Sequence, residues 1–147
     1  MKTLLLILVT ALFMNCAYSQ KIKESEVPSP VKAKFQSLHP DVKDATWLKL
    51  KVGDYEAEFT QNKKDFGVSF DSLGNLKETE MEMKVSELSK EIHDYVAKNY
   101  PGYKITEAAQ ITYADGKPMY EAEITKGKDV SDLLFDSSFK FVKKGQF

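Results

Sequence analysis

The sequence predicts an α+β fold in which one antiparallel sheet of about eight strands carries two helices on the same face. Two segments place apolar residues at helical spacing, and most of the remaining chain alternates apolar with polar residues between turn signals. Strands that alternate in this way have one apolar face and one polar face. The two amphipathic helices can cover the apolar face, which gives a two-layer domain.

An internal duplication supports this architecture. The letters YEAE at residues 55–58 recur at residues 120–123, and FDS at 70–72 recurs at 135–137. Both offsets are the same, since 120 − 55 and 135 − 70 each equal 65. We therefore predict two tandem helix-plus-four-strand repeats, at about 27–85 and 86–147, within a single domain that covers residues 20–147.

The first residues predict export. Met1-Lys2-Thr3 precedes a short apolar run, and Ala17-Tyr18-Ser19 has the small-x-small pattern of a cleavage site. We expect a signal peptide at residues 1–19, and a mature protein in the periplasm or the medium with no membrane association. Cys16, the sole cysteine, falls within the signal, so we expect no disulfide and no thiolate chemistry.

The first repeat follows a polar stretch, residues 20–26, that reads as a loose lead-in. Ser29-Pro30 is typical of a helix start, and His39-Pro40 of its end. The expected helix presents Val27, Val31, Phe35 and Leu38 on one face. Strands are expected at 45–52, 55–60, 66–70 and 76–85, with a tight turn at Gly53-Asp54 and a bulge in the last strand.

The second repeat follows without a linker. Its expected helix face is Leu88, Ile92, Val96 and Tyr100, before Pro101. Strands are expected at 105–113, 119–125, 130–136 and 139–144, with a hairpin turn at Asp115-Gly116. Phe139 replaces the glycine that the first repeat has at position 74, so we expect the two corresponding turns to differ.

These residues resemble the PepSY-like family of exported bacterial proteins. The resemblance covers roughly residues 27–144. In the first repeat it rests on Phe35, His39-Pro40, Trp47, Tyr55, Phe59, Val68 to Asp71, Gly74, Leu76 and Thr79-Glu80; in the second it rests on Tyr100 to Gly102, Ile105, Glu107-Ala108 and Tyr120 to Ile124. It implies the helix-plus-four-strand repeat and a fold shared with β-lactamase-inhibitor proteins, whose concave sheet face holds an enzyme loop. An inhibitor-like role is implied by this resemblance alone.

Several chemistries find no support in the sequence. The sequence has 21 basic residues, all of them lysine, and 22 acidic residues. It therefore offers no arginine for bidentate binding of phosphate or carboxylate, and no basic stripe for nucleic acid. Neither a serine-nucleophile motif, a zinc motif, nor a glycine-rich phosphate loop occurs. His39 and His93 lack partners at ligand spacing. We expect no enzyme activity, cofactor or metal.

The candidate site is the polar face of the sheet, with an unidentified protein or peptide as its partner. By alternation, residues 46, 48, 50 and 52 point to the core, which places Trp47, Lys49 and Lys51 on the open face. Trp47 is there a candidate anchor, although its ring could also support the fold. The same face is expected to carry Glu56, Glu58, Glu121 and Glu123.

Two interpretations of these glutamates stay open at this point. They are expected to pair with Lys49 and Lys51 across the strands as a solvated charged face. Alternatively, two carboxylates at i and i+2 lie about 7 Å apart, and the protein could carry a cation or a small ligand.

Overall fold

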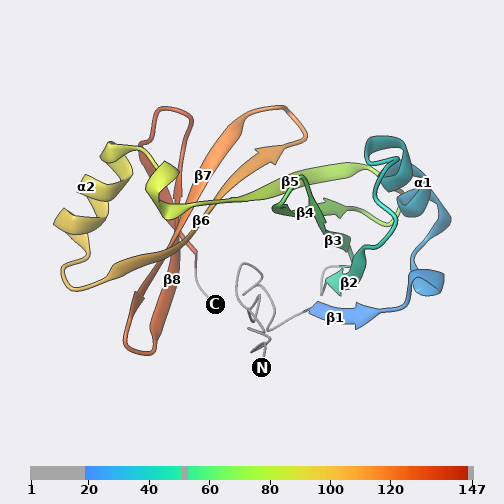
Figure 1. The fold of residues 1–147 in the computed structure, drawn as a ribbon, viewed down its shortest axis with the longest axis horizontal. Helices are drawn as coiled ribbons and strands as arrows, with labels where there is room; N and C mark the ends of the chain where they lie inside the picture. Colours follow the sequence, from blue (N-terminus) through green and yellow to red (C-terminus); the bar gives the residue numbers. More distant parts are fainter. Residues whose placement is uncertain (1–18, 51–52, 146–147) are drawn as a thin grey trace, which may run out of the picture.

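The computed structural model describes residues 19–50 and 53–145, which form two helices and one sheet (Figure 1). The sheet has nine antiparallel strands in simple sequence order, so each strand pairs with the next along the chain. Its strands are β1 (Ser19–Ile22), β2 (Thr46–Leu50), β3 (Tyr55–Gln61), β4 (Lys64–Phe70), β5 (Leu76–Met83), β6 (Lys104–Tyr113), β7 (Pro118–Lys126), β8 (Asp129–Phe135) and β9 (Phe141–Lys144). The helices are α1 (Ser29–Leu38) and α2 (Lys90–Asn99), each preceded by one 3-10 turn.

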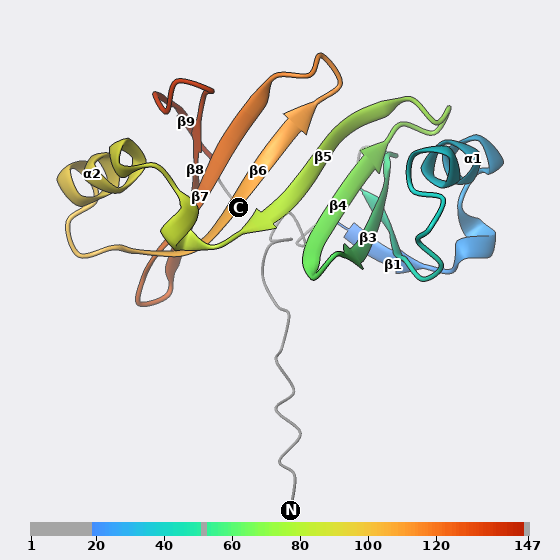
Figure 2. The same ribbon diagram turned by 45° about the horizontal axis from the view of Figure 1, so that its top comes forward.

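Both helices pack on the same face of the sheet, at its two ends (Figures 1 and 2). Val31 and Phe35 of α1 lie over β2, β3 and β4, and Ile92 and Val96 of α2 lie over β6, β7 and β8. Strand β5 joins the two halves, because it pairs with β4 on one side and β6 on the other. The predicted two-layer α+β architecture with one helix-covered face is confirmed, whereas the strand count is nine instead of about eight.

The extra strand is β1, where the sequence suggested a loose lead-in. Lys21 pairs with Leu48 and Ile22 with Trp47, so the polar stretch adds an edge to the sheet. The predicted signal peptide falls almost entirely on residues 1–18, outside the described part of the chain. No helix within residues 19–50 and 53–145 is long and apolar enough to cross a membrane.

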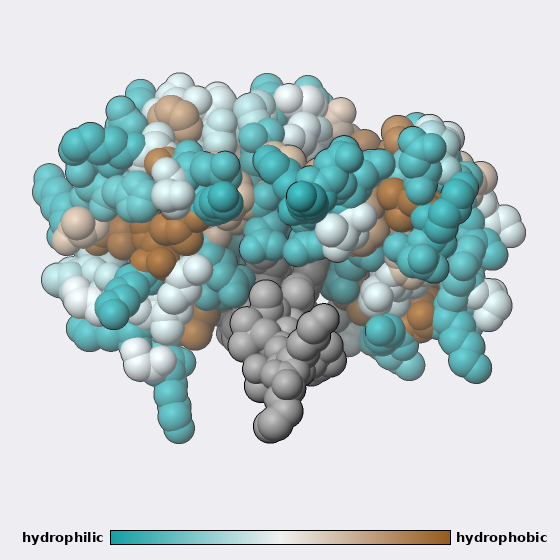
Figure 3. All heavy atoms as spheres, in the orientation of Figure 1, coloured by the Kyte–Doolittle hydropathy of each residue, from teal (hydrophilic) through white to brown (hydrophobic). Residues whose placement is uncertain are grey.

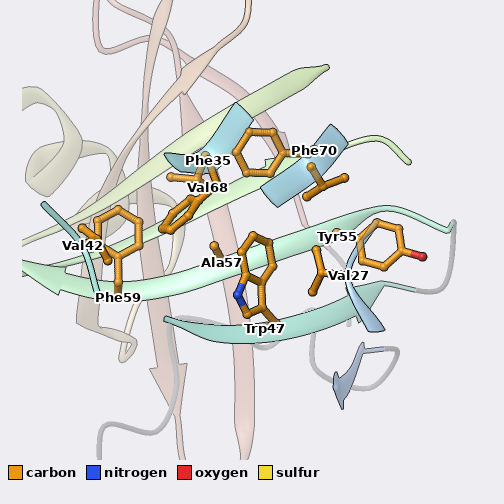
Figure 4. Close-up of a cluster of buried hydrophobic side chains, with 10 residues drawn as sticks. Val27, Phe35, Val42, Trp47, Tyr55, Ala57, Phe59, Val68 and Phe70 are labelled. Atoms are coloured by element: carbon orange, nitrogen blue, oxygen red, sulfur yellow. The ribbon is translucent and has the colours of Figure 1, made fainter. Parts of the chain in front are cut away.

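Trp47 lies in the hydrophobic core, contrary to its predicted position on the open face. Its side chain is only 4% exposed and meets Phe35 of α1 edge-on, with ring centroids 5.2 Å apart (Figure 4). Lys49 pairs with Tyr55 on this same helix-covered face, and Lys51 lies outside the described residues. Trp47 is therefore a core residue of the α1 half and not a surface anchor.

The length of one hairpin loop explains this error. The tight turn expected at Gly53-Asp54 would place Leu50 beside Ala57, in the core. In the structure the Leu50 N–H donates to the Asp54 carbonyl, and the last pair before the turn is Lys49 with Tyr55. Five residues instead of two thus connect the paired positions, and Ala57 faces Trp47. An odd change in loop length moves every side chain of a strand to the opposite face.

The turns after β4 and β8 have the same hydrogen bonds, although we expected them to differ. In the first turn, the Asp71 N–H donates to the Asn75 carbonyl and the Gly74 N–H to the Asp71 carbonyl. In the second turn, the Asp136 N–H donates to the Lys140 carbonyl and the Phe139 N–H to the Asp136 carbonyl. Both glycine and phenylalanine adopt a positive φ at this position, 84° for Gly74 and 60° for Phe139. The geometry is kept, at the cost of an unfavourable backbone conformation for the phenylalanine.

Gly74 is required for a second reason, which yields a prediction. A Cβ on Gly74 would lie 2.6 Å from the Pro30 carbonyl oxygen at the start of α1, whereas a Cβ on Gly116 would meet no atom within 4 Å. Both glycines have a positive φ, so Gly116→Ala is a matched control for backbone strain. We expect Gly74→Ala to lower the free energy of unfolding by about 3 kcal/mol and Gly116→Ala by about 1 kcal/mol.

Urea denaturation followed by circular dichroism measures both values. Equal losses for the two variants would contradict the tight contact between this turn and α1.

Candidate functional site

The open face is the face of the sheet opposite the helices, and strand register identifies its residues. Glu56 and Glu58 alternate with the buried Tyr55, Ala57 and Phe59, so they point away from α1. The pairing register then shows which residues of the neighbouring strands lie on this same face. Eight of its carboxylates are here called the carboxylate cluster: Glu56, Glu58, Glu78, Glu80, Glu107, Glu121, Glu123 and Asp132. Asp65 of β4 and Glu82 of β5 lie on the same face.

Small or uncharged residues separate the acidic strands. Gly67 of β4 lies between Glu58 and Glu80, and Ser69 lies between Glu56 and Glu78. On β6, Ala109 lies between Glu82 and Glu121. Carboxylates in such a row stand two strand spacings apart, about 9–10 Å at the backbone, with little side-chain volume between them.

Few positive charges lie near this face. Strand register places Lys21, Lys104 and Lys143 on it, and Lys77 lines the cleft beside Glu78. Burial has the largest effect on the pKa values of Glu58 and Glu78 and raises both, whereas Lys21 lowers that of Glu58, and Lys77 and Lys143 lower that of Glu78. The salt bridges found within residues 19–50 and 53–145 use other carboxylates, namely Asp54, Asp94 and Asp115. The predicted pairing of the glutamates with Lys49 and Lys51 is wrong for Lys49, because that lysine belongs to the opposite face.

Burial and repulsion between carboxylates raise the pKa values of several members of the cluster. Burial raises the pKa of Glu121 to about 8, and nearby Asp132 and Glu78 add to the effect. Burial together with Glu58 and Glu78 raises the pKa of Glu56 to about 7. Burial, then Glu123, raises the pKa of Asp132 to about 6. Carboxyl groups of this kind are partly protonated at neutral pH in the absence of a cation.

Glu80 lies at the centre of the cluster. Its pKa is raised well above the ordinary value, first by burial and then by Glu121, Glu56, Glu78 and Asp132. Its Oε1 atom is buried and has no hydrogen-bond partner. The same is true of the Oε2 atom of Glu107. Buried polar atoms normally find a partner, so these two oxygens mark unused acceptor capacity.

Glu123 differs from the other members. Its side chain is buried, and its Oε1 accepts a hydrogen bond of 2.6 Å from Thr106 Oγ1. Thr106 stands at the irregularity in β6 between Ile105 and Glu107, where an extra residue brings its hydroxyl to the open face. This glutamate is accordingly held in place by the sheet itself.

The predicted site residues divide into three groups. Glu56, Glu58, Glu121 and Glu123 lie on the open face as expected, Trp47 and Lys49 lie on the helix-covered face, and Lys51 is outside the described residues. The first pair is on β3 and the second on β7, four strands away, or about 19 Å along a flat sheet. They are two separate pairs with Glu80 between them, not one four-carboxylate site.

Sequence reasoning missed the members of the cluster on β5, β6 and β8. The pattern Glu78-x-Glu80-x-Glu82 was the available signal, because it puts three acids on one face of a strand that has few apolar residues. No group of three or more His, Cys, Asp or Glu side chains has the geometry to hold a metal ion within the described ranges 19–50 and 53–145.

Two clefts adjoin the open face. One, of about 470 Å³, includes Glu58, Thr60 and Asp65, and the other, of about 550 Å³, includes Ser69, Glu78 and Tyr113. Apolar Leu48, Ile111 and Leu134 are buried on the same face. Polar residues dominate the view of Figure 3, with apolar patches towards both ends. The surface therefore combines carboxylates with hollows of side-chain size.

The fold and this face define a class of protein, a two-layer α+β domain with one sheet face left free by its helices. A family described as "Putative beta-lactamase-inhibitor-like, PepSY-like" matches residues 53–143. The chain belongs to this PepSY-like family, as its sequence resemblance indicated. The family is defined by its likeness to inhibitor proteins and not by a known reaction. No curated protein sequence matches the chain.

Solved structures share the fold. A "BLIP-like protein" from Bacteroides fragilis has 19% identity and a TM-score of 0.65, with 80% of this chain and 85% of that chain covered. A structure titled "putative periplasmic proteins" from Bacteroides eggerthii has 14% identity and a TM-score of 0.71, with 81% and 88% covered. At these identities the similarity shows the fold alone.

The raised pKa values predict that stability falls as pH rises. The folded protein holds protons on Glu56, Glu121 and Asp132 at pH values where the unfolded chain, with ordinary carboxyl pKa values, has lost them. Stability from these groups is therefore complete below about pH 4 and is lost as pH rises through about 6 to 8. We expect the free energy of unfolding to decrease by on the order of 3 kcal/mol between pH 5 and pH 8.

Denaturant unfolding at several pH values measures this slope. Glu121→Gln should flatten it, while Glu91→Gln on the exposed side of α2 should leave it unchanged. A free energy that is constant or rises from pH 5 to pH 8 would contradict the repulsion within the cluster.

Proposed function

We propose that the protein is an exported, non-enzymatic binding module that holds a protein or peptide on the open face of its sheet. One observation carries the proposal. The two helices cover only one face, and the opposite face offers unneutralised carboxylates, buried apolar residues and two clefts. Such a mixture of apolar and polar groups is typical of protein interfaces.

The comparisons support the exported setting and the binding role. The family's likeness to β-lactamase inhibitors and the "BLIP-like" neighbour suggest a role in which a sheet face holds part of another protein. The neighbour described as periplasmic, together with the signal peptide expected at residues 1–19, favours the periplasm. We also propose that the two halves are copies of one helix-plus-four-strand unit, which would explain their shared turns.

The carrier alternative has less support. In this alternative, Glu56, Glu58, Glu121 and Glu123 together bind a cation or a small ligand. These residues form two pairs on distant strands, and one member, Glu123, already accepts a hydrogen bond from Thr106. A broad surface suits a macromolecule better than a small ligand, which prefers a pocket that surrounds it.

Site-specific photo-crosslinking tests the proposed function. A benzophenone amino acid is placed at Thr60 or Tyr113 on the open face, and at Lys34 or Lys98 on the helices as matched controls. The variants are expressed in the cells that naturally make the protein and are irradiated. We expect a discrete crosslinked protein from both open-face positions and none from the helix positions. No crosslink from the open face, or the same product from all four positions, would contradict the proposal.

A further inference from the structure

The cluster around Glu80 is acidic, crowded and incompletely satisfied. Glu80 is surrounded by Glu56, Glu78, Glu121 and Asp132, all close enough to raise its pKa. Its Oε1 is buried without a hydrogen-bond partner. A buried carboxylate with neither a counter-ion nor a donor is strongly unfavourable, and a positively charged donor would relieve it.

Gly67 places no side chain of its own beside this carboxylate. It lies in the middle of β4, is buried, and pairs with Glu58 on one side and Glu80 on the other. Glycine within a strand weakens the strand and often marks the close approach of a ligand or another backbone. Glu58 and Glu80 therefore flank a position without a side chain, about two strand spacings apart at the backbone.

The protein's own lysines form no salt bridge with Glu80 or Glu58 within the described residues. Lys21 and Lys143 lie on the two edge strands, and Lys104 lies at the start of β6. Burial raises the pKa values of both Glu58 and Glu80; the charge of Lys21 lowers that of Glu58, whereas acidic neighbours raise that of Glu80 further. The charge on the open face is thus complementary to a basic group from outside. Charge complementarity at an interface selects the partner and speeds the encounter.

We propose that the partner places an arginine or lysine side chain over Gly67, where its charged end contacts Glu80 and Glu58. This inference rests on the proposed function and names the chemistry of the partner, a protein segment with exposed basic residues. An arginine fork can donate to two carboxylates at once, which suits the spacing across the glycine.

A peptide titration tests this inference. The probe is an acetylated and amidated Gly-Arg-Gly-Arg-Gly peptide, and its control has citrulline, which is uncharged and of nearly the same shape, in place of each arginine. Amide NMR shifts of ¹⁵N-labelled protein report binding and its location. We expect saturable shifts at β3, β4 and β5 with the arginine peptide, with a Kd of about 1 mM or below. Raising the salt to about 0.5 M should weaken binding severalfold.

Variants separate charge from shape. Glu80→Gln removes the ionisable group, and Gly67→Val places a side chain between Glu58 and Glu80 without changing any charge. Each should weaken binding of the arginine peptide by about tenfold or more. The matched control Glu91→Gln, on α2, should bind as the wild type does. Equal binding of the two peptides, no saturable binding, or wild-type affinity in both variants would overturn the proposal.

The same variants, combined with the benzophenone at Thr60, distinguish the two proposals. Loss of the crosslink in Glu80→Gln and Gly67→Val supports recognition of a basic side chain. A crosslink that persists in both variants overturns this inference but leaves the binding function intact. Absence of the crosslink in the protein without these substitutions overturns the proposed function itself.

Discussion

Like-charge repulsion on one face of the sheet is opposed by hydrophobic packing on the other. The two cores, built by α1 over β2 to β4 and by α2 over β6 to β8, bury residues such as Phe70 and Phe135 completely. Burial of one large apolar side chain contributes about 1.5–3 kcal/mol. The cores can therefore stabilise strands whose outward residues would by themselves repel one another.

The pairing of the strands makes this repulsion unavoidable. The acidic residues of the cluster on β3 and β7 alternate with core residues of the same strand, so their positions follow from the packing beneath them. Moving Glu56 away from the open face would move Tyr55 and Ala57 out of the core. The carboxylates are held in place by the same register that forms the fold.

Much of the fold could be predicted from periodicity, and the failures have physical causes. The helices, the bulge in β5 and the cluster members on β3 and β7 followed from the spacing of apolar residues and from the duplicated YEAE segment. The bulge is at Lys77, because Glu78 and Leu76 pair with the consecutive residues Ser69 and Phe70. The orientation of β2 could not be predicted, because Trp47 and Leu48 are both buried and its two faces are nearly equally apolar. Only the loop length decides between them, and the letters Gly53-Asp54 suggested a shorter loop than the one that forms.

The candidate site was predicted only in part, and the reason is related. Alternation shows which residues share a face of one strand, but it does not show which strands lie together across a sheet. The central position of Glu80 arises from the order β3–β4–β5–β6–β7, which brings acids of three strands around it. Nor does periodicity show that the lysines lie at the edges. Residue spacing thus predicted that Glu56 and Glu121 lie on the open face, but it did not predict the neighbours that raise their pKa values.

Side-chain ¹³C NMR titration of the glutamate carboxyl carbons tests the central claim most directly, because it observes the protonation of each carboxyl group in the folded protein. The structure predicts midpoints near pH 7 for Glu56 and near pH 8 for Glu121. Midpoints close to 4.5 for Glu56 and Glu121 would contradict the account, since they would mean that the open face carries no buried repulsion.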